Sequence, residues 1–188
     1  MDKLVISGKY KLNGFINVHG SKNAALPILV SSLLSNHDLT LSNIPKVDDI
    51  NNMLKLIRGL GVKIKKNKNT LILNSSFIKN ISTDYEIVRK MRASVLVLGP
   101  LLSRFGYSKI SLPGGCAIGT RPIDIHLDGL SKLGAKFKIE NGFVIGSVKN
   151  KLKGNKIKLP FPSVGATENI LMASVLAEGE TIIYQAAR

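Results

Sequence analysis

The sequence predicts an α/β fold built from a repeated unit of about 70 residues, which is about twice the length of an ordinary βαβ unit. Strand-like and helix-like patterns alternate along the whole chain. One helix-to-strand junction occurs twice, as Leu60-Gly61-Val62-Lys63 and again as Leu133-Gly134-Ala135-Lys136. Three segments of small and apolar residues, which begin near residues 21, 91 and 163, are separated by a similar interval. Together these observations indicate an internal repeat.

The first unit follows a short segment with the pattern of a strand. Apolar residues recur at even spacing in residues 12–18, which is the period of a half-buried strand. A helix is expected from residue 21, and a second helix over residues 50–60, where apolar residues follow helical spacing after two aspartates. We expect Gly61 to end that helix and a strand to follow it.

The second and third units are expected to repeat this order. Strands are predicted at residues 110–112, 136–139, 156–159 and 181–184, and helices from residues 91, 123 and 163. Two units, at about residues 21–90 and 91–155, are expected to be complete. The third, residues 156–188, is expected to be partial and cut short at Arg188, because a stacked unit needs a neighbour to cover its apolar face.

The composition is that of a globular chain. Of its 188 residues, 44% are hydrophobic and 21% are charged, which is enough to build a sizeable core. The single cysteine excludes an internal disulfide framework and the three histidines lack zinc-like spacing, so we expect no metal and no cofactor. No segment reaches the roughly 20 apolar residues of a membrane span, and the start does not resemble a signal peptide. We therefore expect a soluble, cytoplasmic chain.

The charge balance predicts an anionic partner. Lys and Arg number 27 against 12 Asp and Glu, giving a net charge of +15. The partner is either a small phosphorylated ligand or a polyanion such as nucleic acid. Most of the lysine excess falls on the polar phase of predicted strands and is interpreted as a solvated face. A nucleic-acid-binding module is kept as an alternative, although only 5% of the residues are aromatic and no basic helix carries base-reading side chains.

Polar residues stand at the predicted helix starts. Lys22 and Asn23 open the first helix, Arg92 opens the second, and Ser163-Val164-Gly165-Ala166-Thr167 opens the third. A helix N-terminus attracts anions, and pseudo-symmetry would gather such ends about one axis. The simpler interpretation is an N-cap region with a solvated lysine. The repetition favours an anion site.

The segment from Pro113 to Pro122 is expected to be a long surface loop, because it holds three glycines between an apolar strand and a helix. Cys116 stands at its centre and Arg121 near its end. A neighbouring arginine favours the thiolate and can bind phosphate together with the helix N-terminus. We therefore interpret Cys116 as an exposed reactive thiol, whereas a lone cysteine is more often a small buried hydrophobe. The histidines His19 and His126 are expected to be structural.

Four motifs occur in order along the chain, and together they carry a specific resemblance. They are Gly20-Ser21-Lys22-Asn23-Ala24-Ala25-Leu26-Pro27, Met91-Arg92-Ala93-Ser94, the stretch from Leu112 through Asp124, and Ser163-Val164-Gly165-Ala166-Thr167. From Met1 to Arg188 the chain resembles the UDP-N-acetylglucosamine enolpyruvyl transferase family. Phe161 and Pro162 stand where many members carry a basic or polar residue.

The resemblance implies a fold and a domain organisation. The family fold is an inside-out α/β barrel of βαβαββ units around a pseudo-threefold axis, present in two domains with the active site between them. Residues 1–20 would be opening strands that belong to the other domain, and residues 21–188 an incomplete domain, truncated in its third unit. Family members are more than twice this length, so the implied partner is the downstream half of the same polypeptide, with no nucleic acid and no membrane.

The resemblance also implies an activity and the residues that serve it. The family moves the enolpyruvyl group of phosphoenolpyruvate to the 3-hydroxyl of UDP-N-acetylglucosamine and releases phosphate, the first committed step of peptidoglycan synthesis. Cys116 would be the catalytic proton donor and the target of fosfomycin. The family's catalytic base and a further phosphoenolpyruvate-binding arginine would lie outside residues 1–188. The implied substrate-binding residues are Lys22, Asn23, Arg92, Arg121, Pro122, Ile123, Asp124, Ile125, Phe161, Pro162, Ser163 and Val164.

A second enzyme hypothesis is the shikimate-pathway enolpyruvyl transferase, which shares the fold. The cysteine loop and the motif from Ser163 to Thr167 argue against it. For the 188-residue chain alone we expect weak sugar-nucleotide binding and negligible turnover.

Overall fold

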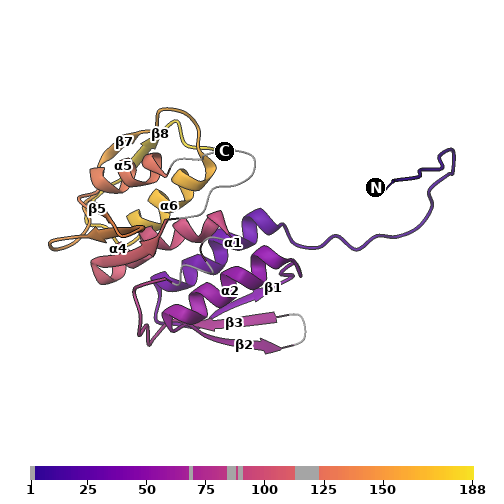
Figure 1. The fold of residues 1–188 in the computed structure, drawn as a ribbon, viewed down its shortest axis with the longest axis horizontal. Coiled ribbons are helices and arrows are strands. Elements are labelled where there is room, and N and C mark those ends of the chain that lie inside the picture. Colours follow the sequence, from indigo (N-terminus) through magenta and orange to yellow (C-terminus); the bar gives the residue numbers. More distant parts are fainter. Residues whose placement is uncertain (1–2, 68–69, 84–87, 89–90, 113–122) are drawn as a thin grey trace.

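A computed structural model describes residues 3–67, 70–83, 88, 91–112 and 123–188 of the chain. Its body contains two three-stranded sheets, a short parallel strand pair, and helices packed between and beside them (Figure 1). Four helices pack against one another at the centre: α1 (Lys22–Ser31), η2 (Arg92–Val97), α4 (Leu98–Phe105) and α6 (Val164–Ser174). Leu29 of α1, Leu98 of α4 and Ile170 of α6 are fully buried there.

The first unit has the order helix, strand, helix, hairpin. Its strands form one antiparallel sheet in the order β1-β3-β2. Its elements are α1 (Lys22–Ser31), η1 (Ser32–Leu34), β1 (Leu39–Ser42), α2 (Asp48–Leu60), β2 (Lys63–Asn67) and β3 (Thr70–Asn74).

The second unit repeats the first, which confirms the predicted repeat. Its sheet order β4-β6-β5 matches β1-β3-β2, and both hairpins have the same register, since Lys63 pairs with Asn74 and Lys136 with Ser147. Its elements are η2 (Arg92–Val97), α4 (Leu98–Phe105), β4 (Tyr107–Ser111), α5 (Asp124–Lys132), β5 (Lys136–Glu140) and β6 (Phe143–Ser147).

The third unit contains the parallel pair β7 (Lys156–Lys158) and β8 (Ile182–Tyr184), joined through α6 (Val164–Ser174). A parallel bridge between Ser82 and Lys109 places residues 81–83 beside β4 in the same way that β7 lies beside β8. The strands predicted at residues 156–159 and 181–184 and the helix predicted from residue 163 are confirmed.

The repeated junction has the same backbone in both units. Gly61 follows α2 with φ +113°, and Gly134 follows α5 with φ +103°. This left-handed region suits glycine, which carries no Cβ, and it turns the chain from the helix into the next strand. Two acidic residues, Asp48 and Asp49, lie in the first turn of α2, where they favour the positive end of the helix dipole. The glycine of the junction therefore ends the helix and leads into the next strand, as the sequence predicts.

Residues 3–20 differ from the expected strand. They contain no strand and run away from the body as an extended arm (Figure 1). Their large apolar side chains, Leu12, Phe15 and Ile16 among them, are almost fully exposed. A strand is stabilised by hydrogen bonds to a neighbouring strand, and no described segment pairs with this arm. The alternating pattern is present, but the described part of the chain offers it no partner strand.

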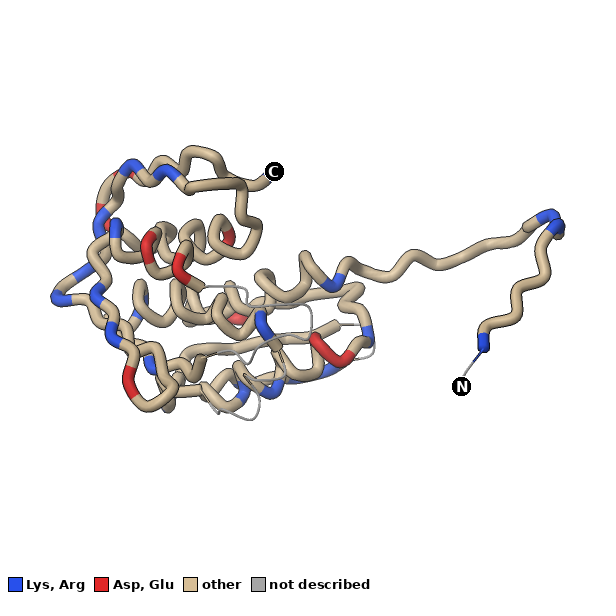
Figure 2. Tube along the Cα trace, turned by 45° about the horizontal axis from the view of Figure 1, so that its top comes forward, with Lys and Arg blue, Asp and Glu red and all other residues tan. Residues whose placement is uncertain are grey.

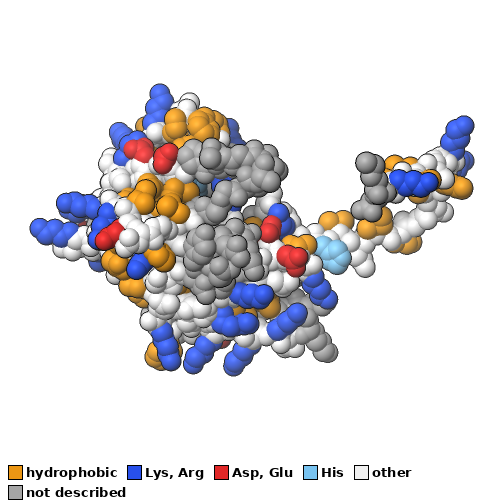
Figure 3. Space-filling view, viewed as in Figure 1, with side chains coloured by type: hydrophobic (Ala, Val, Ile, Leu, Met, Phe, Trp, Pro, Cys, Tyr) orange, Lys and Arg blue, Asp and Glu red, His pale blue; other side chains and the backbone are white. Residues whose placement is uncertain are grey.

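The surface carries the lysine excess. Lys and Arg are distributed along the whole trace, arm included, and acidic residues are few (Figure 2). Basic side chains gather over the region of α2, β2 and β3 in Figure 3. The six strand lysines expected to be solvated are all exposed, which confirms that interpretation: Lys63, Lys65, Lys136, Lys138, Lys156 and Lys158.

Candidate functional site

A cleft of about 450 Å³ opens where the helices of the three units begin. Its lining includes Lys22 and Asn23 of α1, Arg92 of η2, and Val164 and Gly165 of α6. The sequence predicts that these helix starts meet, and the cleft lining confirms it. Backbone N–H groups at a helix start lack partners within the helix, so such a cleft favours anionic ligands.

Local sequence explains why two of these helices begin where they do. Ser21 caps α1, and its hydroxyl accepts from the backbone N–H of Ala24 at 3.4 Å. Ser163 caps α6 in the same way, accepting from the N–H of Ala166 at 3.4 Å. Each cap satisfies one N–H and leaves neighbouring N–H groups at the helix start.

An ion pair crosses the cleft from α1 to α2. The Lys22 Nζ lies 2.6 Å from the Asp49 Oδ2, and both side chains remain partly exposed. Lys22 is therefore held at the cleft wall by a solvated carboxylate, and a ligand anion would compete with Asp49 for it. Asp49 is a cleft residue that the sequence marks only as a helix-start charge.

His126 of α5 forms part of the cleft wall and is buried. Burial, together with the positive charge of Arg92, lowers the pKa of His126 to about 4. The ring is therefore neutral at physiological pH. Glu168 of α6 also lines the cleft, and partial burial raises the pKa of its carboxyl group. Glu168 follows Gly165 by about one helical turn, a spacing that could have identified it from the sequence.

The remaining described candidates lie at the starts of α5 and α6, outside the cleft lining. Ile123 precedes α5 and is buried, and Asp124 and Ile125 belong to its first turn. Phe161 and Pro162 are exposed and come directly before Ser163, the α6 cap. A role for these residues in binding stays a prediction. Cys116, Arg121 and Pro122 lie outside the described residues.

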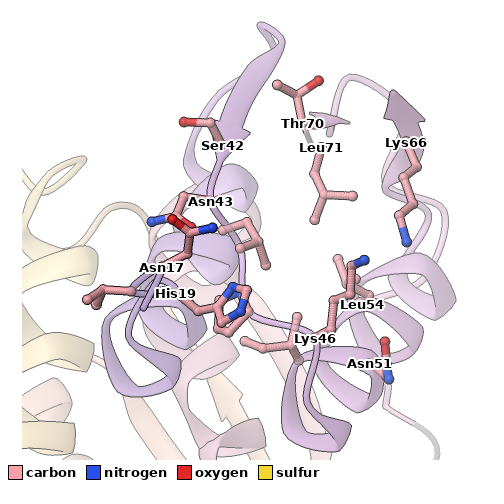
Figure 4. Close-up of a pocket in the computed structure, with 14 residues that line it drawn as sticks. Asn17, His19, Ser42, Asn43, Lys46, Asn51, Leu54, Lys66, Thr70 and Leu71 are labelled. Atoms are coloured by element: carbon pink, nitrogen blue, oxygen red, sulfur yellow. The ribbon is translucent and has the colours of Figure 1, made fainter. Parts of the chain in front are cut away.

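A second cavity of about 530 Å³ lies where the arm joins the body. Asn17 and His19 from the arm lie across from Lys66 and Thr70 of the β2–β3 hairpin (Figure 4). Of the residues singled out from the sequence as substrate-binding, none that the structure describes lines it. The cleft at the helix starts is therefore the stronger candidate site.

The described part of the chain contains neither a metal-ligand cluster nor a membrane-spanning helix. No group of three or more His, Cys, Asp or Glu side chains there could hold a metal ion. No helix in that part is long and apolar enough to cross a membrane.

Residues 6–188 match the family described as EPSP synthase (3-phosphoshikimate 1-carboxyvinyltransferase). The chain belongs to this carboxyvinyltransferase family. Among relatives, UDP-N-acetylglucosamine 1-carboxyvinyltransferase of Acinetobacter baylyi is 50% identical over 188 residues, 100% of this chain and 45% of the relative. The protein of that name from Nitratidesulfovibrio vulgaris is 52% identical, again over 100% of this chain and 45% of the relative. The chain thus spans less than half the length of these curated carboxyvinyltransferases.

Solved structures of carboxyvinyltransferase-like proteins share the fold. The enolpyruvyl transferase NikO from Streptomyces tendae superposes with a TM-score of 0.79 at 17% identity, over 94% of this chain and 41% of that one. An EPSP synthase from Acinetobacter baumannii gives a TM-score of 0.70 at 21% identity, over 90% of this chain and 40% of that one. The predicted enolpyruvyl-transferase fold class is confirmed.

Proposed function

We propose that the chain forms a substrate-binding half-site of a UDP-N-acetylglucosamine 1-carboxyvinyltransferase. The reaction transfers the enolpyruvyl group of phosphoenolpyruvate to the 3-hydroxyl of the sugar nucleotide and releases phosphate. The observation that carries the proposal is the cleft in which three helix starts meet beside Lys22 and Arg92. Relatives at about 50% identity that bear this name support the choice of substrates. The reaction would place the protein in bacterial peptidoglycan synthesis, and so in cell shape and division, in the cytoplasm.

The proposal assigns roles to the polar cleft residues at the helix starts and to the segments beside them. Lys22 and Asn23 bind phosphoenolpyruvate, the lysine as a point charge and the amide as a hydrogen-bonding group. Arg92 and the helix starts hold anionic oxygens and stabilise the departing phosphate. Residues 121–125 and 161–164 flank the UDP-sugar. Residues 1–20, which include the arm, belong to the other domain of the complete enzyme.

The chemical step needs a proton donor as well as binding groups. When the sugar 3-hydroxyl oxygen bonds to C2 of phosphoenolpyruvate, C3 accepts a proton; loss of phosphate and of a C3 proton then restores the double bond. Cys116 is proposed as the donor to C3 and as the fosfomycin target. The base that accepts the hydroxyl proton is proposed to lie outside residues 1–188.

Phosphate release from phosphoenolpyruvate, with UDP-N-acetylglucosamine as acceptor, tests the proposed reaction. We expect release by the chain extended along its reading frame beyond Arg188 and negligible release by residues 1–188. Turnover by the short chain at an ordinary enzymatic rate, about 1–1,000 per second, would overturn the half-site assignment. Release with shikimate 3-phosphate, but not with the sugar nucleotide, would replace the proposed acceptor.

Titration calorimetry with UDP-N-acetylglucosamine and phosphoenolpyruvate tests the binding role of the cleft. In the extended chain, Lys22→Ala should weaken phosphoenolpyruvate binding about tenfold or more, since it removes a charged contact. Lys55→Ala is the matched control, because Lys55 is an exposed lysine on α2 that does not line the cleft. Equal effects of the two variants would show that only net charge matters, which would argue against this cleft as the site.

A further inference from the structure

Asn169 is a polar side chain in the middle of the molecule. It belongs to α6, is fully buried, and contacts three other segments. Its Oδ1 accepts from the Gly99 backbone N–H at 2.8 Å, and its Nδ2 donates to the Val95 carbonyl at 3.0 Å. The same Nδ2 lies 3.1 Å from the His126 Nδ1. One amide thus connects α6 with η2, α4 and α5.

This network fixes the orientation of the Asn169 amide. Its oxygen must face the Gly99 N–H and its nitrogen must face the Val95 carbonyl, because the reverse arrangement would oppose like groups at both contacts. The second N–H of Nδ2 therefore points to His126. Since an amide N–H only donates, the His126 Nδ1 must accept, and a neutral ring then carries its proton on Nε2.

The other edge of the His126 ring lies against the start of α6. A Cβ placed on Gly165 would lie 3.2 Å from the His126 Cε1 and 3.5 Å from Nε2. Both Gly165 and His126 line the cleft. The protonated nitrogen is therefore on the side of the ring that adjoins the helix start.

We propose that Asn169 is a positioning residue that holds His126 in its Nε2–H tautomer, so that the cleft presents an uncharged N–H donor to a phosphate oxygen of the ligand. The choice of ligand rests on the proposed function, whereas the tautomer rests on the Asn169 contacts alone. Asn169 touches no ligand itself in this proposal and acts through the ring.

The surroundings of His126 keep its ring in the neutral form. Burial disfavours the charged ring, and the positive charge of Arg92 on η2 adds to this effect. Lys22 of α1, Asp49 of α2 and Glu168 of α6 line the same cleft, and Asp124 and Asp128 lie on α5 itself. Because the pKa of His126 is lowered to about 4, the ring stays neutral from alkaline pH down to about pH 5, and the Nε2–H donor is unchanged over that range.

Long-range ¹H–¹⁵N correlation spectra of the ¹⁵N-histidine-labelled chain measure the tautomer directly. His19→Gln and His37→Gln variants assign the signals of the two exposed histidines, which leaves the His126 signals. We expect a neutral ring protonated on Nε2, with no titration above about pH 5. A ring protonated on Nδ1, or one that exchanges between both tautomers, would overturn the proposal.

Asn169→Asp tests the coupling, and Ser174→Ala is the control. The new carboxylate should accept from Nδ1–H, move the ring proton to Nδ1 and raise the pKa of His126. The control removes a polar group at the far end of α6, where the Ser174 hydroxyl donates to the Ile170 carbonyl, and should leave the tautomer unchanged. A variant that folds and keeps the Nε2–H tautomer would contradict the proposal. If Asn169→Asp does not fold, the tautomer of the unmodified chain decides.

Ligand affinity separates this inference from the proposed function. In the extended chain, Asn169→Asp should bind UDP-N-acetylglucosamine about tenfold more weakly than the unmodified chain, the usual effect of losing one hydrogen bond to a charged group. An altered tautomer with unaltered affinity would refute the role of His126 as a ligand donor. No sugar-nucleotide binding by the unmodified chain would refute the proposed function and leave the tautomer assignment standing.

Discussion

At Gly99, helix α4 lies so close to α6 that no side chain fits between them. A Cβ at this position would lie 2.4 Å from the Asn169 backbone oxygen and 2.5 Å from its Oδ1. Neither atom belongs to a flexible chain end, so Gly99→Ala must separate the two helices. We expect the free energy of unfolding to fall by about 2 kcal/mol or more, measured by urea denaturation.

Gly59→Ala is the matched control for Gly99→Ala. Gly59 also lies within a helix, α2, but a Cβ there would meet nothing within 4 Å. Alanine should raise the free energy of unfolding by about 0.5–1 kcal/mol, because glycine loses more backbone freedom in a helix. If Gly99→Ala lowered the free energy of unfolding no more than Gly59→Ala does, this result would contradict the close packing of α4 on α6.

Local motifs predict the cleft residues that stand at the three helix starts. They do not predict the cleft residues that other helices contribute. Lys22, Asn23 and Arg92 are marked by local motifs, and their repetition predicts that they meet. Asp49 and His126 enter through the packing of α2 and α5, which no local pattern encodes. Asn169 has a local signal in its position directly before an apolar run, because a polar side chain buried on such a helix needs hydrogen-bond partners.

At the scale of elements, the repeated helix-to-strand junction separates the energetic cost of backbone strain from that of steric contact. Gly61 and Gly134 both have positive φ, so alanine is strained at either position. At Gly61 a Cβ would also meet the Lys79 nitrogen and the Phe77 oxygen at 2.8 Å, whereas nothing lies within 4 Å at Gly134. We expect Gly134→Ala to cost about 1 kcal/mol of unfolding free energy and Gly61→Ala clearly more. Equal losses by urea denaturation would mean that backbone strain alone governs both junctions.

The elements that were predicted correctly are those whose signal lies within their own residues. The helix α2 and strands β2, β5 and β7 follow the apolar spacing of their own sequence. The segment at residues 12–18 has an equally clear alternation, yet it forms no strand. A strand also needs a neighbouring strand to which it can hydrogen-bond, and the alternation of apolar residues does not show whether one is present.

At the scale of the whole molecule, the chain divides into a packed body and an exposed arm. Gly20 marks the boundary, because a Cβ there would lie 2.1 Å from the Asn43 backbone oxygen, which leaves room only for hydrogen. Beyond it, the core helices of the three units pack together and place the cleft at their common starts. The body therefore holds the cleft without help from the arm.

Deletion of residues 3–16 tests this division. The large apolar side chains of that stretch, such as Leu4, Leu12 and Phe15, are almost fully exposed, so their loss removes little buried surface. We expect the free energy of unfolding to change by less than about 0.5 kcal/mol, with an unchanged urea m-value. Extending the deletion through residue 24 removes the Ser21 cap and the Lys22–Asp49 pair, and should cost about 1–2 kcal/mol. A large loss from the shorter deletion would show that residues 3–16 pack on the body in solution.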